Sequence, residues 1–566
     1  MFSHWERKGN GLCANGRVPS FGYNPLTLSR TSPLQWTRGA VLALFLLIPS
    51  FAAAQAKPPQ APTAPVCIKC HRTETLRYLS TAMGRSFGSP EPTANAVVKH
   101  ERSGSTISVT TENGTMFHTL SEHGFIAKYA VPYQVGGGMQ GATFLVRLDD
   151  YLFESPLSWF NAYGWDVSPG YEMKNVLEFD RGVAKECIYC HATGARFDDP
   201  DGRHLISKYL EPITCERCHG PSEQHVQHPT SANILNPAKL SGPVRDSICE
   251  QCHLEGIVRI LNPGKEWTDY QPGKVTEDSF TKYVMLGYDK PEVPLASEVE
   301  QFAQSRCVQA SKGKFWCSAC HNPHREPRPR QKEIRAVCTS CHQKLSPAAH
   351  PASVKECTSC HMPTTTKVTI NHASNTDHRI LRNPATYKAP AQKPKLVAWR
   401  EPPEPARQRN LGLAELQLSP TDYEDLWHDG AKQLLSLPLD QLKNDPEVVG
   451  ALEDYFFRTG DMEKAVEFGQ RSVDLNPRSA DAALNFARVL QASGATAEAD
   501  VQYQRAIKLD PSLKEAYGRL AMSYAKDHDT EDATKVLDQY LKWNPDEIFF
   551  HEMKQRLHAA PGGAAQ

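Results

Sequence analysis

Short runs that alternate apolar and polar residues occupy residues 95 to 165. Typical runs are 106–110, 125–131 and 142–148, and they are separated by Asn113-Gly114 and by the glycines at 136–138. Alternation with a period of two places side chains on the two faces of a β-strand, and these glycine-containing sequences are typical of the turns between strands. The pattern therefore predicts a small β-rich insertion at about 95–165.

The C-terminal part, 413–560, shows helical periodicity instead, with a longer repeat superimposed on it. Prolines recur every 34 residues, and an alanine stands twelve residues before each of them. These residues are Pro477, Pro511 and Pro545, with Ala465, Ala499 and Ala533. A 34-residue period with small residues where two helices pack is the tetratricopeptide pattern, which predicts an α-solenoid. The first repeat departs from the pattern, because Glu453 stands at a position for a small residue.

A third hydrophobic pattern lies near the N-terminus, where residues 40–54 are mostly apolar, follow Arg38 and end in small residues. A basic segment, a short apolar segment and small residues at its end are the features of a secretory signal. We therefore expect a signal peptide with a long basic region at 1–56 and a periplasmic or secreted location. An uncleaved membrane anchor is the alternative, although Pro49 interrupts the run, which is short for a membrane span.

Residues 383–412 are rich in proline and charged residues. Prolines stand at 384, 390, 394, 402, 403 and 405. Such a composition predicts an extended, semi-rigid linker. The expected order along the chain is therefore the signal (1–56), a cysteine-rich domain (57–382) with its β-rich insertion, the linker (383–412) and the repeats (413–560).

Length and charge narrow the possible functions. The chain has 566 residues and a formal net charge of -1 at pH 7. Several domains are expected at this length, and the charge indicates neither nucleic acid nor an acidic membrane surface as a partner. The 42 prolines and 35 glycines indicate much loop.

Fourteen of the 16 cysteines occur in seven copies of Cys-x-x-Cys-His. The cysteine pairs and their histidines are Cys67, Cys70 and His71; Cys187, Cys190 and His191; Cys215, Cys218 and His219; Cys249, Cys252 and His253; Cys317, Cys320 and His321; Cys338, Cys341 and His342; and Cys357, Cys360 and His361. This spacing is the attachment site of c-type haem. Both thiols lie on one side of a helical turn, where they can add to the two vinyl groups of one porphyrin, and the histidine can then bind the iron. The motifs predict seven covalent haem c groups, and thus a heptahaem cytochrome.

Other chemistry uses similar spacings. A single Cys-x-x-Cys could be half of a zinc site or a thioredoxin-like redox pair. Here every pair carries the trailing histidine, a feature that neither alternative requires, and thioredoxin-like sites do not repeat seven times. Haem attachment is therefore the preferred interpretation.

Motif spacing predicts two clusters. The second to fourth motifs start 28 and 34 residues apart, and the fifth to seventh start 21 and 19 residues apart. Residues 317 to 361 are too few to build an apolar core around three haems, so the haem faces must supply the buried surface. We expect a mainly α, loop-rich haem domain that does not fold without its porphyrins.

The sixth ligand of each iron separates an electron carrier from an enzyme, because an open position can bind a substrate. Ten histidines outside the motifs lie between residues 71 and 378. Six are candidate distal ligands: His225, His324, His350, His372, His378 and His100. His225 and His324 are the best placed, since each lies just beyond a motif and can reach a neighbouring haem. The other four, His118, His123, His204 and His228, are interpreted as ordinary polar residues.

Three further residues could approach an iron. Met83 and Met139 are weaker candidates for a sixth ligand. Cys307 has no obvious partner and is interpreted as a buried free thiol, with haem ligation as the alternative.

Several segments between the motifs resemble those of multihaem cytochromes of the cytochrome c-554/c-prime kind, in versions fused to tetratricopeptide repeats. They are Thr81-Ala-Met-Gly-Arg-Ser-Phe87, His100-Glu-Arg-Ser-Gly104, Trp165-Asp-Val-Ser-Pro-Gly-Tyr171, Cys215-Glu-Arg-Cys-His-Gly-Pro221, Cys317-Ser-Ala-Cys-His-Asn-Pro-His324 and Thr376-Asp-His-Arg-Ile380. The resemblance implies periplasmic electron transfer with mostly bis-histidine haems. The sequence departs from this resemblance at residues 136–141, which contain no histidine, whereas such cytochromes often have a histidine at this place.

These observations favour an electron conduit between redox partners, with the repeats docking a partner protein on their concave face. No Cys-x-x-Cys-Lys variant, nucleophile set or Rossmann glycine pattern is present in the sequence. The alternative is a multihaem oxidoreductase that acts on a small nitrogen or sulfur compound at a five-coordinate haem. A structural scaffold is the third hypothesis, disfavoured because tetratricopeptide repeats fold without haem.

Overall fold

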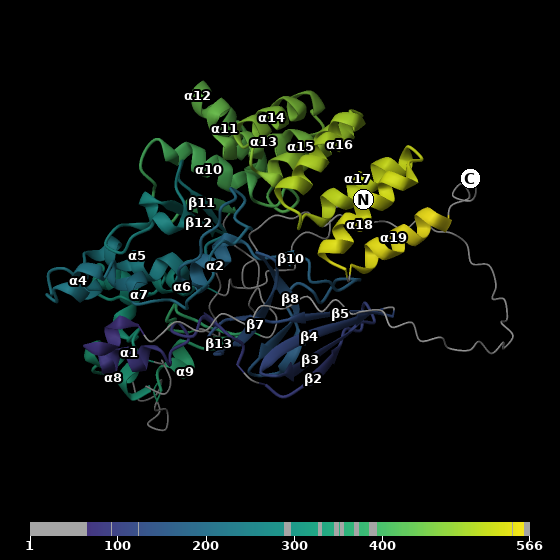
Figure 1. Ribbon diagram of the computed structural model, residues 1–566. Helices are drawn as coiled ribbons and strands as arrows, with labels where there is room; N and C mark the ends of the chain where they lie inside the picture. Colours follow the sequence, from purple (N-terminus) through teal and green to yellow (C-terminus); the bar gives the residue numbers. More distant parts are fainter. Residues whose placement is uncertain are drawn as a thin grey trace.

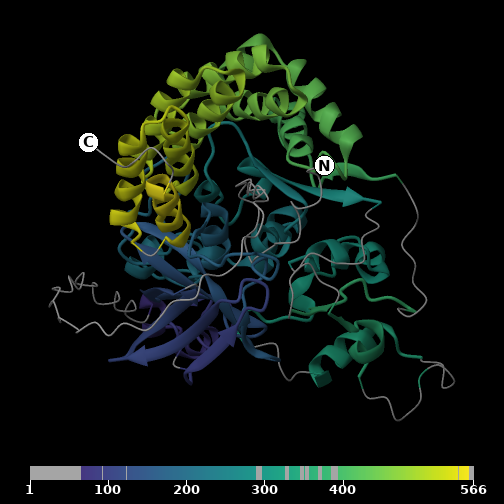
Figure 2. The same cartoon turned by 90° about the vertical axis from the view of Figure 1, so that its right-hand side faces the viewer.

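The computed structural model describes residues 65–91, 93–122, 124–287, 296–325, 331–344, 350, 356–366, 373–383, 393–545 and 547–559. Strands, loops and short helices form the part of the chain before residue 400, and long helices form the rest. Figures 1 and 2 show the long helices, in green and yellow, as an arc that lies over the strands and the short helices.

Two antiparallel sheets make up the β-rich part. The first has the order β2-β3-β4-β5, with strands Ala96–Lys99, Thr106–Glu112, Thr115–Glu122 and Phe125–Ala130. The second has the order β1-β6-β7-β8-β10, and β9 pairs with β8. Its strands are β1 Phe87–Gly88, β6 Tyr133–Val135, β7 Gly141–Leu148, β8 Tyr151–Phe160, β9 Gly164–Val167 and β10 Arg181–Gly182. The predicted strands are present, but the β-rich part extends from Phe87 to Gly182, beyond both predicted ends.

The alternating pattern explains the first sheet. Along β4, every second side chain is buried, including Met116, His118 and Leu120, and these pack with side chains of the second sheet in one apolar cluster. Asn113 and Gly114 join β3 to β4, and both have positive φ, 51° and 79°. This conformation suits an Asn-Gly hairpin turn, as the sequence predicts.

His118 is a buried polar residue in this apolar cluster. Its side chain is fully buried, its Nδ1 shares a hydrogen bond of 2.7 Å with the Ser155 hydroxyl, and the rings of Phe144 and Trp165 pack edge-on against it. Burial lowers the pKa of His118 from 6.5 to about 3, because the charged ring would lose its hydration.

The β-rich part should therefore lose stability in mild acid. Between pH 6.5 and pH 3 the unfolded chain binds a proton at His118 that the folded chain does not, so stability falls as pH falls. From pH 7 to pH 5 this costs about 2 kcal/mol. Denaturant midpoints at the two pH values should differ more in the native protein than in His118→Asn, which keeps a polar group but has nothing to protonate. If the midpoints differ equally in the two proteins, the buried neutral state of His118 would be contradicted.

The motifs lie on short helices and in loops. The 3-10 helices are η1 Val66–Lys69, η2 Pro237–Lys239, η3 Trp267–Asp269, η4 Thr276–Asp278 and η5 Cys317–Ala319. The α-helices are α1 Arg72–Tyr78, α2 Lys185–His191, α3 Glu216–His219, α4 Glu223–Gln227, α5 Gly242–His253, α6 Glu298–Ala303, α7 Arg306–Ser311, α8 Gln331–Cys341 and α9 Thr358–His361. A two-stranded sheet joins β13 Thr364–Thr365 to β14 Asn375–Thr376. The mainly α haem domain is not confirmed, because strands are as prominent as helices there.

Part of the predicted linker is built into the fold. Its residues Lys395–Ala398 form β15, which pairs with β12 (Phe280–Leu286) in a sheet that also holds β11 (Val258–Leu261). Arg400 follows and binds two buried carboxylates, Glu277 and Glu250, at 3.0 Å each. Helix α10 then begins at Ala406, inside the predicted linker. Residues 384–392, with Pro384 and Pro390, lie outside the described residues.

Paired antiparallel helices form the arc, as the 34-residue period predicts. They are α10 Ala406–Leu416, α11 Glu424–Leu435, α12 Leu439–Asn444, α13 Pro446–Thr459, α14 Met462–Leu475, α15 Ala480–Ser493, α16 Thr496–Leu509, α17 Lys514–Lys526, α18 Thr530–Trp543 and α19 Ile548–Ala559. The alanines Ala465, Ala499 and Ala533 are fully buried between helices. The region is an α-solenoid of tetratricopeptide repeats.

Glu453, the exception in the repeat pattern, is buried opposite a glycine. A Cβ added at Gly469 would lie 2.9 Å from Glu453 Oε1 and 2.5 Å from the Phe486 ring, so the missing side chain at 469 provides the space for the carboxyl group. Burial raises the pKa of Glu453 to about 8. The carboxyl group is therefore mostly protonated at neutral pH.

The arc should consequently lose stability as pH rises. Between pH 4.5 and pH 8 the folded chain holds a proton on Glu453 that the unfolded chain has released. The free energy of unfolding therefore decreases as pH rises through this range. From pH 6 to pH 8 the loss is about 2 kcal/mol. Glu453→Gln keeps the shape without the titration, so its thermal midpoint, followed by helical circular dichroism, should fall less between these two pH values. An equal fall in both proteins would exclude the buried neutral carboxyl.

The arc is fixed to the rest of the molecule by ion pairs. Arg203, in a loop after the second motif, binds Asp481 at 2.8 Å and Asp510 at 2.6 Å. Lys514 bridges Glu178 of the β-rich part and Glu547 of the arc, at 2.5 and 2.8 Å. The repeats therefore hold a set position relative to the motifs.

Candidate functional site

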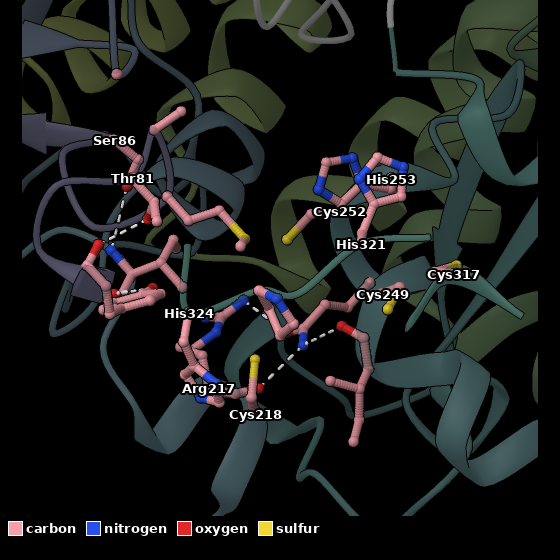
Figure 3. A pocket seen from close by; sticks show the side chains of 18 of the residues that line it. Thr81, Ser86, Arg217, Cys218, Cys249, Cys252, His253, Cys317, His321 and His324 are labelled. Carbon is pink, nitrogen blue, oxygen red and sulfur yellow. Dashed lines mark hydrogen bonds between the residues drawn. The ribbon is translucent and has the colours of Figure 1, made fainter. Parts of the chain in front are cut away.

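The first five motifs surround one large cavity of about 2120 Å³. This volume is several times that of a small-molecule pocket, which is about 300–1,000 Å³. Cysteines and histidines of the first five motifs line it, and Figure 3 shows Cys218, Cys252, His253, His321 and His324 around the same hollow. The lining thus includes the residues of five motifs that can attach haem.

Four motif histidines face a second histidine across a gap. The ring centres are 6.3 Å apart for His71 and His225, 5.8 Å for His219 and His324, 6.2 Å for His321 and His378, and 6.2 Å for His361 and His350. The ring planes differ by 15° to 31° within these pairs. Metal–imidazole bonds are about 2.0–2.1 Å long, so two imidazoles on opposite faces of one metal ion have ring centres roughly 6 Å apart. The pairs fit one iron between each two rings.

Hydrogen bonds orient these histidines. The Nδ1 atoms of His219 and His361 donate to the carbonyls of Leu235 and Leu381, at 2.9 and 2.8 Å. His378, which faces the motif histidine His321, donates from Nδ1 to the carbonyl of Thr376 at 2.7 Å. Since a carbonyl only accepts, Nδ1 carries the proton and Nε2 is left free to bind a metal, which is the usual arrangement of ligating histidines.

His225 is held in the same way. Its Nδ1 lies 3.0 Å from the Thr230 carbonyl oxygen and 3.1 Å from Asn233 Oδ1, both acceptors. Its Nε2 therefore remains free to bind a metal in the gap between His225 and His71.

His253 has a carboxylate behind it in place of a carbonyl. Glu298 Oε2 lies 3.6 Å from His253 Nδ1, and this contact raises the pKa of His253. For His191, burial lowers the pKa and favours the neutral ring that a metal needs. Within the described residues, no second histidine ring faces His191, His253 or His342.

The remaining predicted histidines lie elsewhere. His100 is 5% exposed, with Nδ1 bonded to the Ser103 hydroxyl at 2.8 Å and Nε2 to the Glu172 carbonyl at 3.1 Å. Both of its nitrogens are occupied, so the structure does not bring it to a motif histidine. His204 lies between Asp198 and Asp150. His372 and His123 fall outside the described residues.

Cysteines of different motifs meet in pairs, which sequence spacing does not reveal. A hydrogen bond between Cys190 and Cys252 lowers the pKa of the first thiol and raises that of the second, and Cys317 and Cys249 are related in the same way. Burial and the adjacent Cys67 raise the pKa of Cys215 to about 11. Burial and the adjacent Cys357 raise the pKa of Cys338 to about 11. The first motif thus lies beside the third, and the second lies beside the fourth. The fourth motif also lies beside the fifth, and the sixth lies beside the seventh.

Cys307 lies among the fifth and sixth motifs. Burial and the nearby Cys341 raise the pKa of its thiol, and it also acts electrostatically on Cys320 and Cys338. Its thiol is free and half-buried. Its position lies between the group of the second, fourth and fifth motifs and the pair of the sixth and seventh motifs.

Comparisons with known proteins agree with these features. The family described as "Doubled CXXCH motif" matches residues 309–347, and the family "Cytochrome c554 and c-prime" matches residues 166–220. The human protein O-mannosyl-transferase TMTC1 is 24% identical over 152 residues, which are 26% of this chain and 16% of that protein. The chain therefore spans a small part of this curated relative.

Solved structures also show similarity. MamA is 21% identical, with 25% of this chain and 82% of that chain covered and a TM-score of 0.23. YrrB, described as a TPR protein with an unusual peptide-binding site, is 19% identical, with 27% and 76% covered and a TM-score of 0.23. Among the described residues, no helix is both long and apolar enough to cross a membrane.

A substitution at His324 tests the facing pairs. In His324→Ala the His219 iron would lose its sixth protein ligand, so one low-spin haem should become high-spin in the electron paramagnetic resonance spectrum. The control is His100→Ala, whose ring is bonded to Ser103 and Glu172 and should leave the spin states unchanged. An unchanged spectrum for His324→Ala, with full haem content, would contradict the pairing.

Proposed function

We propose that this multihaem c-type cytochrome, fused to tetratricopeptide repeats, relays electrons between redox partners outside the cytoplasm through seven covalent haem c groups. The observation that carries the proposal is the set of four facing histidine pairs. An iron with two histidine ligands has no open position for a substrate, so it can exchange electrons but cannot bind a reactant.

The residues that would hold the haems fit them. Each motif offers two thiols for the porphyrin edge and one histidine for the iron, and His225, His324, His378 and His350 offer a second ligand to four motifs. Haem supplies one-electron iron chemistry. The polypeptide fixes the rings of its histidines through backbone carbonyls and encloses the site in a cavity that is largely apolar.

The paired cysteines support a continuous path. Since a thioether joins each cysteine directly to the edge of its porphyrin, adjacent cysteines of two motifs place two porphyrin edges close together. The pairs connect motifs one with three, two with four, four with five and six with seven. His324, just after the fifth motif, faces His219 of the third and so links the first and third motifs to the second, fourth and fifth. Cys320 of the fifth motif acts electrostatically on Cys338 of the sixth, which connects the last two motifs.

The repeats are proposed to dock a protein partner. Arg203 and Lys514 fix the arc beside the loop that follows the second motif, so a bound partner would approach this end of the path. Helices α1, α8 and α9, which accompany the first, sixth and seventh motifs, lie at the end away from the arc (Figure 1). A second partner would exchange electrons there. The predicted signal at 1–56 supports export, which covalent haem attachment requires in bacteria.

A second candidate is an oxidoreductase that reacts with a small nitrogen or sulfur compound. It is favoured by His191 and His253, which face no second histidine within the described residues. The negative charge of the Glu298 carboxylate, 3.6 Å behind His253, would make this ring a more basic ligand, since a nearby opposite charge stabilises positive charge on the imidazole.

One experiment separates the two candidates. The oxidised holoprotein is treated with cyanide and with nitric oxide and examined by paramagnetic resonance. The relay predicts low-spin irons that bind neither ligand and a rapid, complete reduction of all haems by a low-potential electron donor. A high-spin signal that disappears with cyanide, together with turnover of a small substrate, would reject the pure relay. His253→Met then tests whether the open iron belongs to the fourth motif.

A further inference from the structure

Arg217 lies where three motifs meet. It is the residue before the second cysteine of the third motif, and its guanidinium contacts Gln251 and Tyr189, the residues before the second cysteines of the fourth and second motifs. It also interacts electrostatically with Cys252, Cys190 and Cys218. These cysteines belong to the fourth, second and third motifs. Arg217, Cys218 and Cys252 surround the same hollow in Figure 3. One positive charge thus stands beside the attachment points of three haems.

The groups that contact Arg217 are neutral. Its Nη2 donates to Gln251 Oε1 at 2.8 Å, and its guanidinium carbon lies 4.2 Å from the centre of the Tyr189 ring. Gln251 is fixed by its own bonds, because its amide group donates to the carbonyls of Arg217 and Ile248. In the described part of the chain, no carboxylate lies within 4 Å of this guanidinium. A phenol is neutral near pH 7, so neither neighbour balances the charge.

Other arginines near the motifs have acidic neighbours. Arg245 stacks on Trp316, beside the fifth motif, and is paired with Asp246 at 2.9 Å. Arg259 donates to Cys190 Sγ at 3.4 Å, and the carboxyl group of Glu255 is close enough to act on its charge. Arg217 differs from both, since its neighbours are an amide, a phenol and sulfur atoms.

An unbalanced charge in the protein interior is costly, and negative charge that arrives nearby offsets the cost. One-electron reduction of an iron brings such charge, and haem potentials respond to nearby charge and to burial. We propose that Arg217 raises the reduction potentials of the haems held by the second, third and fourth motifs, so that electrons collect where these motifs meet. This inference rests on the haem attachment in the proposed function, and it adds a residue that sets the direction of electron flow.

The test is a spectroelectrochemical titration of the full holoprotein, in which the electrons come from an electrode. In Arg217→Gln, the reduction steps at highest potential should shift to lower potential by at least tenfold in their equilibrium constant, about 59 mV for a one-electron couple. Arg217→Lys keeps the charge and should stay close to the native curve. Gln251→Glu keeps the arginine but places a carboxylate at its 2.8 Å contact, and should shift the same steps downward.

Lys69 provides the matched control. It occupies the same position in the first motif, before the second cysteine, but its side chain is exposed. Water and salt screen an exposed charge, so Lys69→Gln should leave the curve unchanged. Haem content, measured by pyridine haemochrome, establishes that each variant is fully loaded. Superimposable curves for Arg217→Gln, Gln251→Glu and the native protein would overturn the proposal. No redox partner takes part, so the result is independent of whether the relay itself operates.

Discussion

Two imidazole rings with centres about 6 Å apart do not touch, and here four pairs of rings keep this separation, three of them across the walls of one cavity. Each pair joins distant parts of the chain, such as His71 with His225 and His321 with His378. Backbone carbonyls fix several of the rings, so the spacing is part of the fold. In the proposed function, the need to hold an iron between each two rings is the constraint on which the arrangement of the first half of the chain depends.

This constraint explains where the apolar core lies. The large clusters of buried apolar side chains are in the β-rich part and in the repeats, whereas the motifs lie on short helices and loops around the cavity. Flat aromatic macrocycles would supply the missing buried surface among the motifs. The two cores then act as rigid supports: Lys514 joins the repeats to the β-rich part, and Arg203 joins them to the loop after the second motif. In the proposed relay, repeats fixed in this way would present a docked partner to one end of the electron path reproducibly.

Sequence patterns predict the parts whose signals are local. The Asn113-Gly114 turn, the strands around it and the 34-residue helical period are all present in the structure, because turn chemistry and periodicity act over a few residues. The mainly α haem domain is not confirmed, since β1, β6 and β10 are too short to give a clear alternation. The proline-rich segment is predicted to be an extended linker, but its residues Lys395–Ala398 form strand β15. This strand forms because β12 lies beside it, and the composition of the segment gives no sign of that pairing.

The candidate site shows the same division. Spacing identifies the seven motifs and the histidines just beyond two of them. Spacing identifies the neighbouring motifs only in part: the second lies beside the fourth and the sixth beside the seventh, as the clusters predict. The contact of the first motif with the third and that of the fifth with the fourth lie outside the predicted clusters. The position of His100 could not be predicted from the sequence either, because both of its ring nitrogens form hydrogen bonds, with the Ser103 hydroxyl and with the Glu172 carbonyl. Tertiary contacts decide these points.

The haem content of the mature protein tests the central claim most directly. The protein is produced in a host that attaches haem covalently, and its porphyrin is measured by pyridine haemochrome together with the intact mass. The account predicts seven porphyrins per chain, which remain bound after denaturation. A well-folded, colourless product without bound porphyrin would contradict it.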